Sequence, residues 1–76
     1  MIGKTIKYMR INKGFTQENL GKLCNIGRTT LSDYEREKTN IDFDTLEKIS
    51  KICGYKIYFV NEREKFQVKD LERKDI

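Results

Sequence analysis

The chain has 76 residues, enough for one small domain with one modest core, and chains of this size commonly gain stability by oligomerisation. Its 16 basic and 12 acidic residues give a net charge of +4. The excess lies in residues 1–56, which carry 11 Lys and Arg against 7 Asp and Glu. Such a surplus is typical of a nucleic-acid-binding surface, although a solvated lysine-rich surface would give the same count.

The composition argues against an enzyme and against a metal site. Histidine is absent, and the sequence has no glycine-rich phosphate loop and no nucleophile–base pair. Cys24 and Cys53 fall at apolar positions of predicted helices, where we expect buried thiols in a reducing compartment; a disulfide between them is the minor alternative. We expect no cofactor. Without a signal peptide or a membrane-length apolar run, the sequence predicts a cytoplasmic protein.

The first predicted helix covers about residues 3–12. Ile2, Ile6 and Met9 fall on one stripe at helical spacing and are expected to face the core. Tyr8 and Ile11 lie off that stripe, where they are either exposed or used by a partner. Gly14 ends the helix.

Residues 16–36 predict two short helices joined by a turn at residues 25–27. Thr16 is a good N-cap, because its hydroxyl can accept a hydrogen bond from a free N–H of the first turn. Leu20 and Cys24 face the core, and Ile26 fills the space between the two helices. Gly21 is expected to allow a neighbouring helix to cross closely. A helix pair with a glycine-containing turn is the helix-turn-helix unit, whose second helix enters the DNA major groove.

The second helix of this pair has a packing side and a polar side. Leu31 and Tyr34 lie on the packing side, and the opposite arc holds Arg28, Thr29, Ser32, Asp33 and Arg36. Taken alone, this helix could equally be an ordinary amphipathic surface helix. The preceding helix and turn favour the DNA-binding interpretation.

A polar loop at residues 38–40 leads to a fourth predicted helix, capped by Asp42 and running to about Cys53. Its buried stripe is predicted to contain Phe43, Leu46, Ile49 and Cys53, and Gly54 ends it.

Residues 55–60 break the helical pattern with aromatic and β-branched side chains, so we predict a strand. A lone strand needs a partner. It pairs either with the same strand of a second copy or with a following strand at residues 65–68, with residues 61–64 as the hairpin loop; both can hold. The residues expected at a dimer interface are Tyr55, Ile57, Tyr58, Phe59 and Val60. The charged tail at residues 70–76 is expected to be frayed or helical only in context.

Through these motifs, residues 6–55 resemble the Cro/C1-type helix-turn-helix regulators, also called the XRE family. The resemblance rests, at the family's spacing, on Arg10, residues 14–20, Ile26, residues 31–35, residues 44–46, Lys48, Ile49 and Gly54. It implies a mainly α, lambda-repressor-like bundle of four to five helices that binds double-stranded DNA as a homodimer. Residues 1–54 would form the DNA-binding domain, and residues 55–76 a C-terminal strand or hairpin at the dimer interface.

The resemblance also implies roles for individual residues. Base-reading positions are Arg28, Thr29, Ser32 and Asp33, and phosphate-contacting positions are Gln17, Lys38 and Asn40. We also expect phosphate contacts from Arg10, Thr30 and Arg36. Arg10 and Glu35 match a pair that ties the first helix to the third. Arg28 suits a guanine, and Asp33 suits a cytosine amino group.

Three departures from the family pattern stand out. Glu37 replaces the usual glycine after the third helix, which leaves the exit geometry of that helix open. Ile41 stands where a proline is common. The strand at residues 55–60 replaces the family's fifth helix and resembles the antitoxin regulators of the persistence type.

We therefore predict a sequence-specific repressor that binds an inverted-repeat operator, with two recognition helices in successive major grooves about 34 Å apart. The alternative is an antitoxin that neutralises a toxin protein and regulates its own promoter. In that case Tyr8, Ile11, Leu23 and the C-terminal segment would form the toxin-binding surface.

Overall fold

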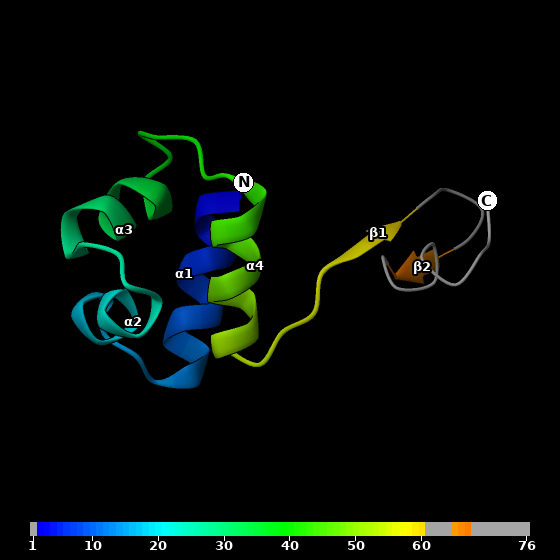
Figure 1. Ribbon diagram of the computed structural model, residues 1–76, viewed down its shortest axis with the longest axis horizontal. Coiled ribbons are helices and arrows are strands. Elements are labelled where there is room, and N and C mark those ends of the chain that lie inside the picture. Colours follow the sequence, from blue (N-terminus) through cyan, green and yellow to red (C-terminus); the bar gives the residue numbers. More distant parts are fainter. Residues whose placement is uncertain (1, 61–64, 68–76) are drawn as a thin grey trace.

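The computed structural model describes residues 2–60 and 65–67. In this part of the chain, four helices precede a two-stranded antiparallel hairpin (Figure 1). These elements are α1 (Ile2–Lys13), α2 (Gln17–Cys24), α3 (Arg28–Glu35), α4 (Phe43–Ile52), β1 (Tyr58–Val60) and β2 (Lys65–Gln67). The prediction of a mainly α bundle with a C-terminal strand or hairpin is confirmed. Within the described residues, no helix has the length and apolar character that a membrane crossing requires.

The helix ends follow the residues that the sequence marks as caps. Gly14, with φ +87°, follows α1, and Thr16 begins α2 by accepting a hydrogen bond from the Asn19 N–H over 3.0 Å. At the start of α4, the Asp42 carboxylate accepts hydrogen bonds from the Thr45 hydroxyl and N–H over 2.6 and 3.2 Å. The bond from that hydroxyl, followed by the one from the N–H, lowers the pKa of Asp42 below its ordinary value. Both predicted N-caps are confirmed.

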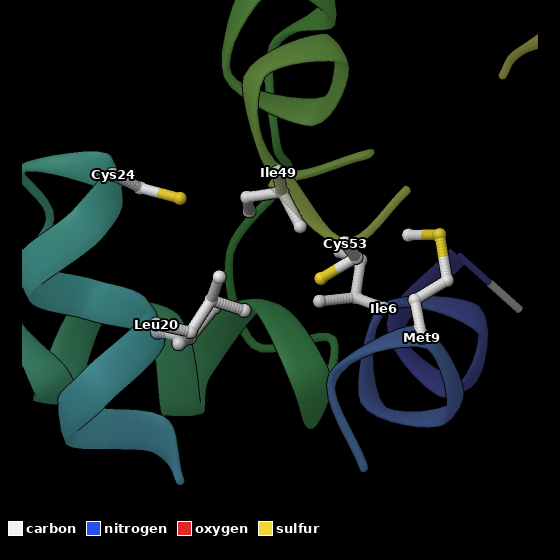
Figure 2. Packing of buried hydrophobic residues seen from close by; sticks show 7 residues of the cluster. Ile6, Met9, Leu20, Cys24, Ile49 and Cys53 are labelled. Atoms are coloured by element: carbon white, nitrogen blue, oxygen red, sulfur yellow. The ribbon is translucent and has the colours of Figure 1, made fainter. Parts of the chain in front are cut away.

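The core forms where the four helices meet, and its centre consists of seven buried side chains: Ile6, Met9, Leu20, Cys24, Leu31, Ile49 and Cys53. Figure 2 shows six of them converging from α1, α2 and the C-terminal half of α4. Both cysteines are free and buried, as predicted. Desolvation by burial raises the pKa of each thiol above its ordinary value of 9.0.

Two residues predicted for the buried stripes lie largely outside the core. Ile2 is 46% exposed and Phe43 is 45% exposed. Each is the first residue of its helix, so its side chain extends past the last packed turn of the bundle. Phe43 instead contacts a ring of the hairpin, as described below.

Two glycines allow backbone segments to approach each other closely. A Cβ on Gly3 would lie 2.5 Å from the Glu35 carbonyl oxygen, so only glycine lets α1 start against the end of α3. A Cβ on Gly21 would lie 2.6 Å from the Ile26 carbonyl oxygen. The expectation that Gly21 accommodates a crossing helix is therefore wrong: the close neighbour is the backbone of the turn between α2 and α3.

Glu37 keeps the left-handed backbone that a glycine would provide after α3, with φ +61°. Its Oε2 atom accepts a hydrogen bond from the Gly3 N–H over 3.2 Å. The exit from α3, left open by the sequence, thus has a left-handed residue although no glycine is present, and the glutamate side chain also caps the start of α1.

The strand predicted at residues 55–60 is shorter in the structure, because its first residue belongs to the bundle. The Tyr55 N–H donates to the Ser50 carbonyl over 2.8 Å, and the Tyr55 hydroxyl accepts from Asn12 Nδ2 over 3.0 Å. β1 begins at Tyr58 and pairs with β2 in the register Tyr58↔Gln67, Phe59↔Phe66 and Val60↔Lys65. The hairpin alternative is thus observed, whereas pairing with a second copy stays a prediction. The predicted loop at residues 61–64 and the tail at residues 70–76 lie outside the described residues.

Candidate nucleic-acid interface

The first turn of α3 presents three exposed polar side chains, those of Arg28, Thr29 and Thr30. Gly27, which precedes the helix in an extended conformation, places no side chain over its start. On the opposite side of α3, Leu31 is fully buried and Glu35 is 7% exposed. The helix is therefore fixed to the bundle through one side, and its first turn is free to contact a ligand.

The second turn of α3 is less open than the sequence predicts. Ser32 and Asp33 are half-buried, although both were expected on an exposed polar arc. The Asp33 carboxylate lies 3.7 Å from Nη2 of Arg36, and these side chains are 31% and 61% exposed. This ion pair partly neutralises two charges that were predicted to act separately, one on a base and one on a phosphate.

The end of α3 is joined to α1 by a nearly buried ion pair. Arg10 Nε donates to Glu35 Oε2 over 2.6 Å, and Arg10 Nη2 donates to Glu35 Oε1 over 3.1 Å. The third guanidinium nitrogen, Nη1, donates to the Phe15 carbonyl over 2.9 Å. All three nitrogens of Arg10 therefore donate hydrogen bonds within the protein, and its contact with a DNA phosphate stays a prediction.

Gln17 extends this network to the start of α2. Its Nε2 atom donates to Glu35 Oε1 over 3.1 Å, so one carboxylate holds side chains from both α1 and α2. The half-buried amide retains an oxygen acceptor and a second N–H. Glu35 thus fixes the start of α2 relative to α3, so this part of the surface is already formed before any ligand of α3 binds.

The predicted phosphate-contacting residues lie at two places around α3. Gln17 and Arg28 share an open hollow of about 470 Å³ between the starts of α2 and α3, lined by Arg10, Phe15, Thr16, Gln17, Glu18 and Arg28. Lys38 and Asn40 are exposed in the loop that follows α3. The Lys38 N–H donates to the Asp33 carbonyl over 2.9 Å, which ties that loop to the helix end.

Sequence reasoning missed several residues that shape this surface. Gly3 was not recognised as a contact point for α3, although an unneeded glycine in a helix is itself a signal of close packing. The i,i+3 spacing of Asp33 and Arg36 could have indicated their pairing. Lys48 Nζ donates to the Cys24 carbonyl over 3.4 Å, linking α4 to the end of α2, and no pattern in the sequence marks that contact.

Comparison with known proteins identifies the family to which this arrangement belongs. The family model described as "Helix-turn-helix" matches residues 6–60. The chain is a member of the helix-turn-helix family. The predicted Cro/C1-type class is confirmed by this match and by the relatives that follow.

Two curated helix-turn-helix relatives are similar over most of the chain. A hypothetical transcription factor of Neisseria meningitidis is 33% identical over 58 residues, which are 76% of this chain and 55% of that protein. The control protein C.BamHI of Bacillus amyloliquefaciens is 38% identical over 55 residues, 71% of this chain and 68% of that protein. The chain thus spans about half the length of the Neisseria relative.

A solved helix-turn-helix structure extends the similarity to the fold. The crystal structure of the biofilm regulator SinR in complex with DNA has a TM-score of 0.67 and 34% identity, covering 72% of this chain and 89% of the chain in that structure. This similarity confirms the lambda-repressor-like bundle. The relatives are a transcription factor, a control protein and a master regulator, so they belong to the class of regulators that the sequence predicts for this chain. They give no support to the resemblance with antitoxin regulators.

Proposed function

We propose that this chain represses transcription by placing α3 in the major groove of a specific duplex DNA site. The observation that carries the proposal is the exposed first turn of α3, held on a rigid frame by buried Leu31 and Glu35. The similarity to SinR, whose structure was determined with DNA, supports the same use of the fold. Two buried, free thiols fit a reducing cytoplasm, where such a DNA target would be found.

The residues on the polar side of α3 recognise the bases. Arg28 donates two hydrogen bonds to the O6 and N7 atoms of a guanine, and the Thr29 methyl group packs on a thymine methyl group. Ser32 and Asp33, being half-buried, reach only bases that approach closely. Asp33 accepts a hydrogen bond from a cytosine amino group and repels phosphate, while Arg36 moderates its charge.

Affinity comes from the residues around α3 that meet the DNA backbone: Gln17, Thr30, Arg36, Lys38 and Asn40. Four of them are exposed, and Gln17 is half-buried with an unused amide N–H. Each cation placed on a phosphate releases counterions, so the affinity should fall steeply with salt, with a slope of about −0.9 per phosphate contact.

The hairpin is proposed to pair two copies of the chain. All three residues of β1 are exposed, Tyr58 by 50%, Phe59 by 47% and Val60 by 66%. A two-stranded hairpin is at best marginally stable alone, and its outer edges offer unpaired N–H and C=O groups to another strand. Because Tyr55 is anchored in the bundle, we place the boundary between the DNA-binding unit and the dimerisation element after Tyr55, with half-buried Ile57 at the junction.

Footprinting on the DNA upstream of the chain's own gene tests this function. A homodimer with two α3 helices should protect an inverted repeat whose half-sites are one helical turn, or a multiple of it, apart. Protection should persist at physiological salt. Weak, uniform binding that disappears above low salt would show that the basic surface attracts DNA without reading it.

A toxin-binding role is a second candidate, supported by three exposed apolar side chains on α1 and α2. Tyr8, Ile11 and Leu23 are 64%, 56% and 56% exposed. A toxin gene in the adjacent reading frame, with co-purification of its product, would favour this role. The absence of both would leave repression as the function.

A further inference from the structure

The hairpin touches the helical bundle through a pair of aromatic rings. The ring centroids of Phe43, the first residue of α4, and Phe59, in β1, lie 6.4 Å apart with 19° between the ring planes. This separation is within the range of favourable stacked aromatic pairs. Both rings stay nearly half exposed, so the contact is made at the surface and is not part of the core.

A second contact anchors the segment that leads to the hairpin. Tyr55 is fixed at the C-terminal end of α4 by its hydrogen bonds to Ser50 and Asn12. The chain then runs through residues 56–57 into β1 and meets the other end of α4 at Phe43. A segment held at one point can rotate about that point, whereas a second contact beyond it fixes the orientation of the hairpin.

The position of Phe43 links the hairpin to the DNA-binding surface. Phe43 directly follows the Asp42 cap and the loop that carries Lys38 and Asn40. In Figure 1 the hairpin lies on the side of α1 and α4 that is opposite to α2 and α3. The bundle therefore lies between the recognition helix and the hairpin, and a rotation at the hairpin would move α3 through a long arc.

We propose that the Phe43–Phe59 contact sets the spacing between the two half-sites that the dimer accepts. The inference rests on the proposed function, namely DNA reading by α3 and pairing through the hairpin. In a two-fold dimer, the angle between hairpin and bundle fixes the separation of the two recognition helices. Neighbouring base pairs are about 3.4 Å apart, so a small rotation at this contact changes the preferred spacing by a base pair or more. Phe43 is a positioning residue in this account and touches no DNA.

The test measures binding to a set of duplexes with identical half-sites and spacers that differ by up to about three base pairs from the wild-type optimum. The wild type should show one sharp optimum. Phe43→Ala should keep the wild-type affinity for a single half-site and the wild-type dimer mass in sedimentation. Its preference for the optimal spacer over the adjacent spacers should fall by about two- to tenfold, the equilibrium factor that corresponds to an aromatic pair.

Two further variants separate positioning from general damage. Phe43→Tyr keeps an aromatic ring and should restore the sharp optimum. Tyr8→Ala removes an equally large exposed ring from α1 and should leave the spacer profile unchanged. A sharp optimum retained in Phe43→Ala would overturn the inference alone, and so would a Phe43→Ala variant that no longer dimerises or binds a half-site. A wild-type protein without any spacer preference would contradict both the proposed dimeric function and the inference about Phe43.

Discussion

Arg10 and Glu35 form a two-point ion pair between α1 and α3, with 2.6 Å between Nε and Oε2. Their side chains are 11% and 2% exposed, so both charges are almost withdrawn from water. The second oxygen of Glu35 also accepts a hydrogen bond from Gln17 at the start of α2. Three helices therefore meet at one carboxylate, which fixes the direction in which α3 is presented.

The first prediction concerns this pair. Glu35→Ala leaves a buried guanidinium without its partner and should lower the free energy of unfolding by about 3–5 kcal/mol. The double variant Arg10→Met, Glu35→Leu should cost less than Glu35→Ala alone, because it leaves no buried charge unpaired. Urea unfolding of Arg10→Met, of Glu35→Leu and of the double variant measures the coupling energy. Strictly additive effects would show that the two side chains act independently.

The second prediction concerns Gly3. In an exposed helix, replacing glycine by alanine stabilises by up to about 1 kcal/mol. Here a Cβ would lie 2.5 Å from the Glu35 carbonyl oxygen and 2.7 Å from the Tyr34 carbonyl oxygen, so the start of α1 must move away from α3. We expect Gly3→Ala to destabilise the fold by about 1–3 kcal/mol. The neighbouring exposed Lys4 gives a matched control, since Lys4→Ala should change stability by less than about 0.5 kcal/mol. Stabilisation by Gly3→Ala in thermal unfolding would contradict the close approach.

The third prediction concerns the buried thiols. Burial raises the pKa of Cys24 and of Cys53 above 9.0, so at pH 8 both should react with a thiol-specific reagent far more slowly than they do in denaturant. A raised pKa in the folded state also means that the folded chain binds protons more tightly than the unfolded chain above the unfolded pKa. Below the unfolded pKa, the thiols should therefore make no pH-dependent contribution to the free energy of unfolding. As the pH rises from the unfolded pKa through the folded pKa, that free energy should fall. Rapid labelling of the native protein at pH 8 would show that the core is open to reagents.

The fourth prediction concerns dimerisation through β1. Val60→Lys places a charge on an exposed strand residue and should weaken the dimer at least about tenfold, because two like charges would meet near the proposed interface. Leu23→Lys makes the same kind of change at an exposed residue of α2 and should leave the dimer intact. Sedimentation equilibrium compares the two. Equal dimer constants for Val60→Lys and the wild type would place the interface elsewhere.

The bundle could be predicted from the sequence because its signals are local. Thr16 and Asp42 cap helices through their own side chains, and buried residues recur at helical spacing within α1 (Ile6, Met9) and within α2 (Leu20, Cys24). These features depend on neighbours a few residues away, which periodicity and capping rules describe directly.

The predictions failed at contacts that lie outside the regular helical repeat. Phe43 has the spacing of a core residue, but it stands at the end of its helix and contacts Phe59, 16 positions along the chain. The sequence places Tyr55 at the start of a strand, but its hydroxyl accepts a hydrogen bond from Asn12, which holds Tyr55 to the bundle. Gly21 lies against the Ile26 carbonyl and not against a crossing helix, and this contact depends on the exact path of the turn. Periodicity carries no information about such contacts.

The sequence predicts which residues form the candidate site better than it predicts their exposure and contacts. Arg28, Thr29 and Thr30 are exposed as expected on the first turn of α3. The half-burial of Asp33 and its ion pair with Arg36 depend on how deeply α3 packs between the other helices of the bundle. That depth depends on the close approach of α1 to the end of α3 at Gly3, which no pattern within α3 encodes.

The central claim is that the first turn of α3 reads bases, and a comparison of Arg28→Ala with Lys38→Ala tests it most directly. Both variants remove one exposed cation near the proposed DNA surface. Binding is measured for the operator and for every single-base variant of one half-site, at several salt concentrations. Lys38→Ala should weaken binding to all sequences equally and reduce the salt slope by about 1. Arg28→Ala should abolish discrimination at one base-pair position, at a cost of about 1–3 kcal/mol on the preferred site. An equal loss on all sequences with Arg28→Ala would contradict base reading by this helix.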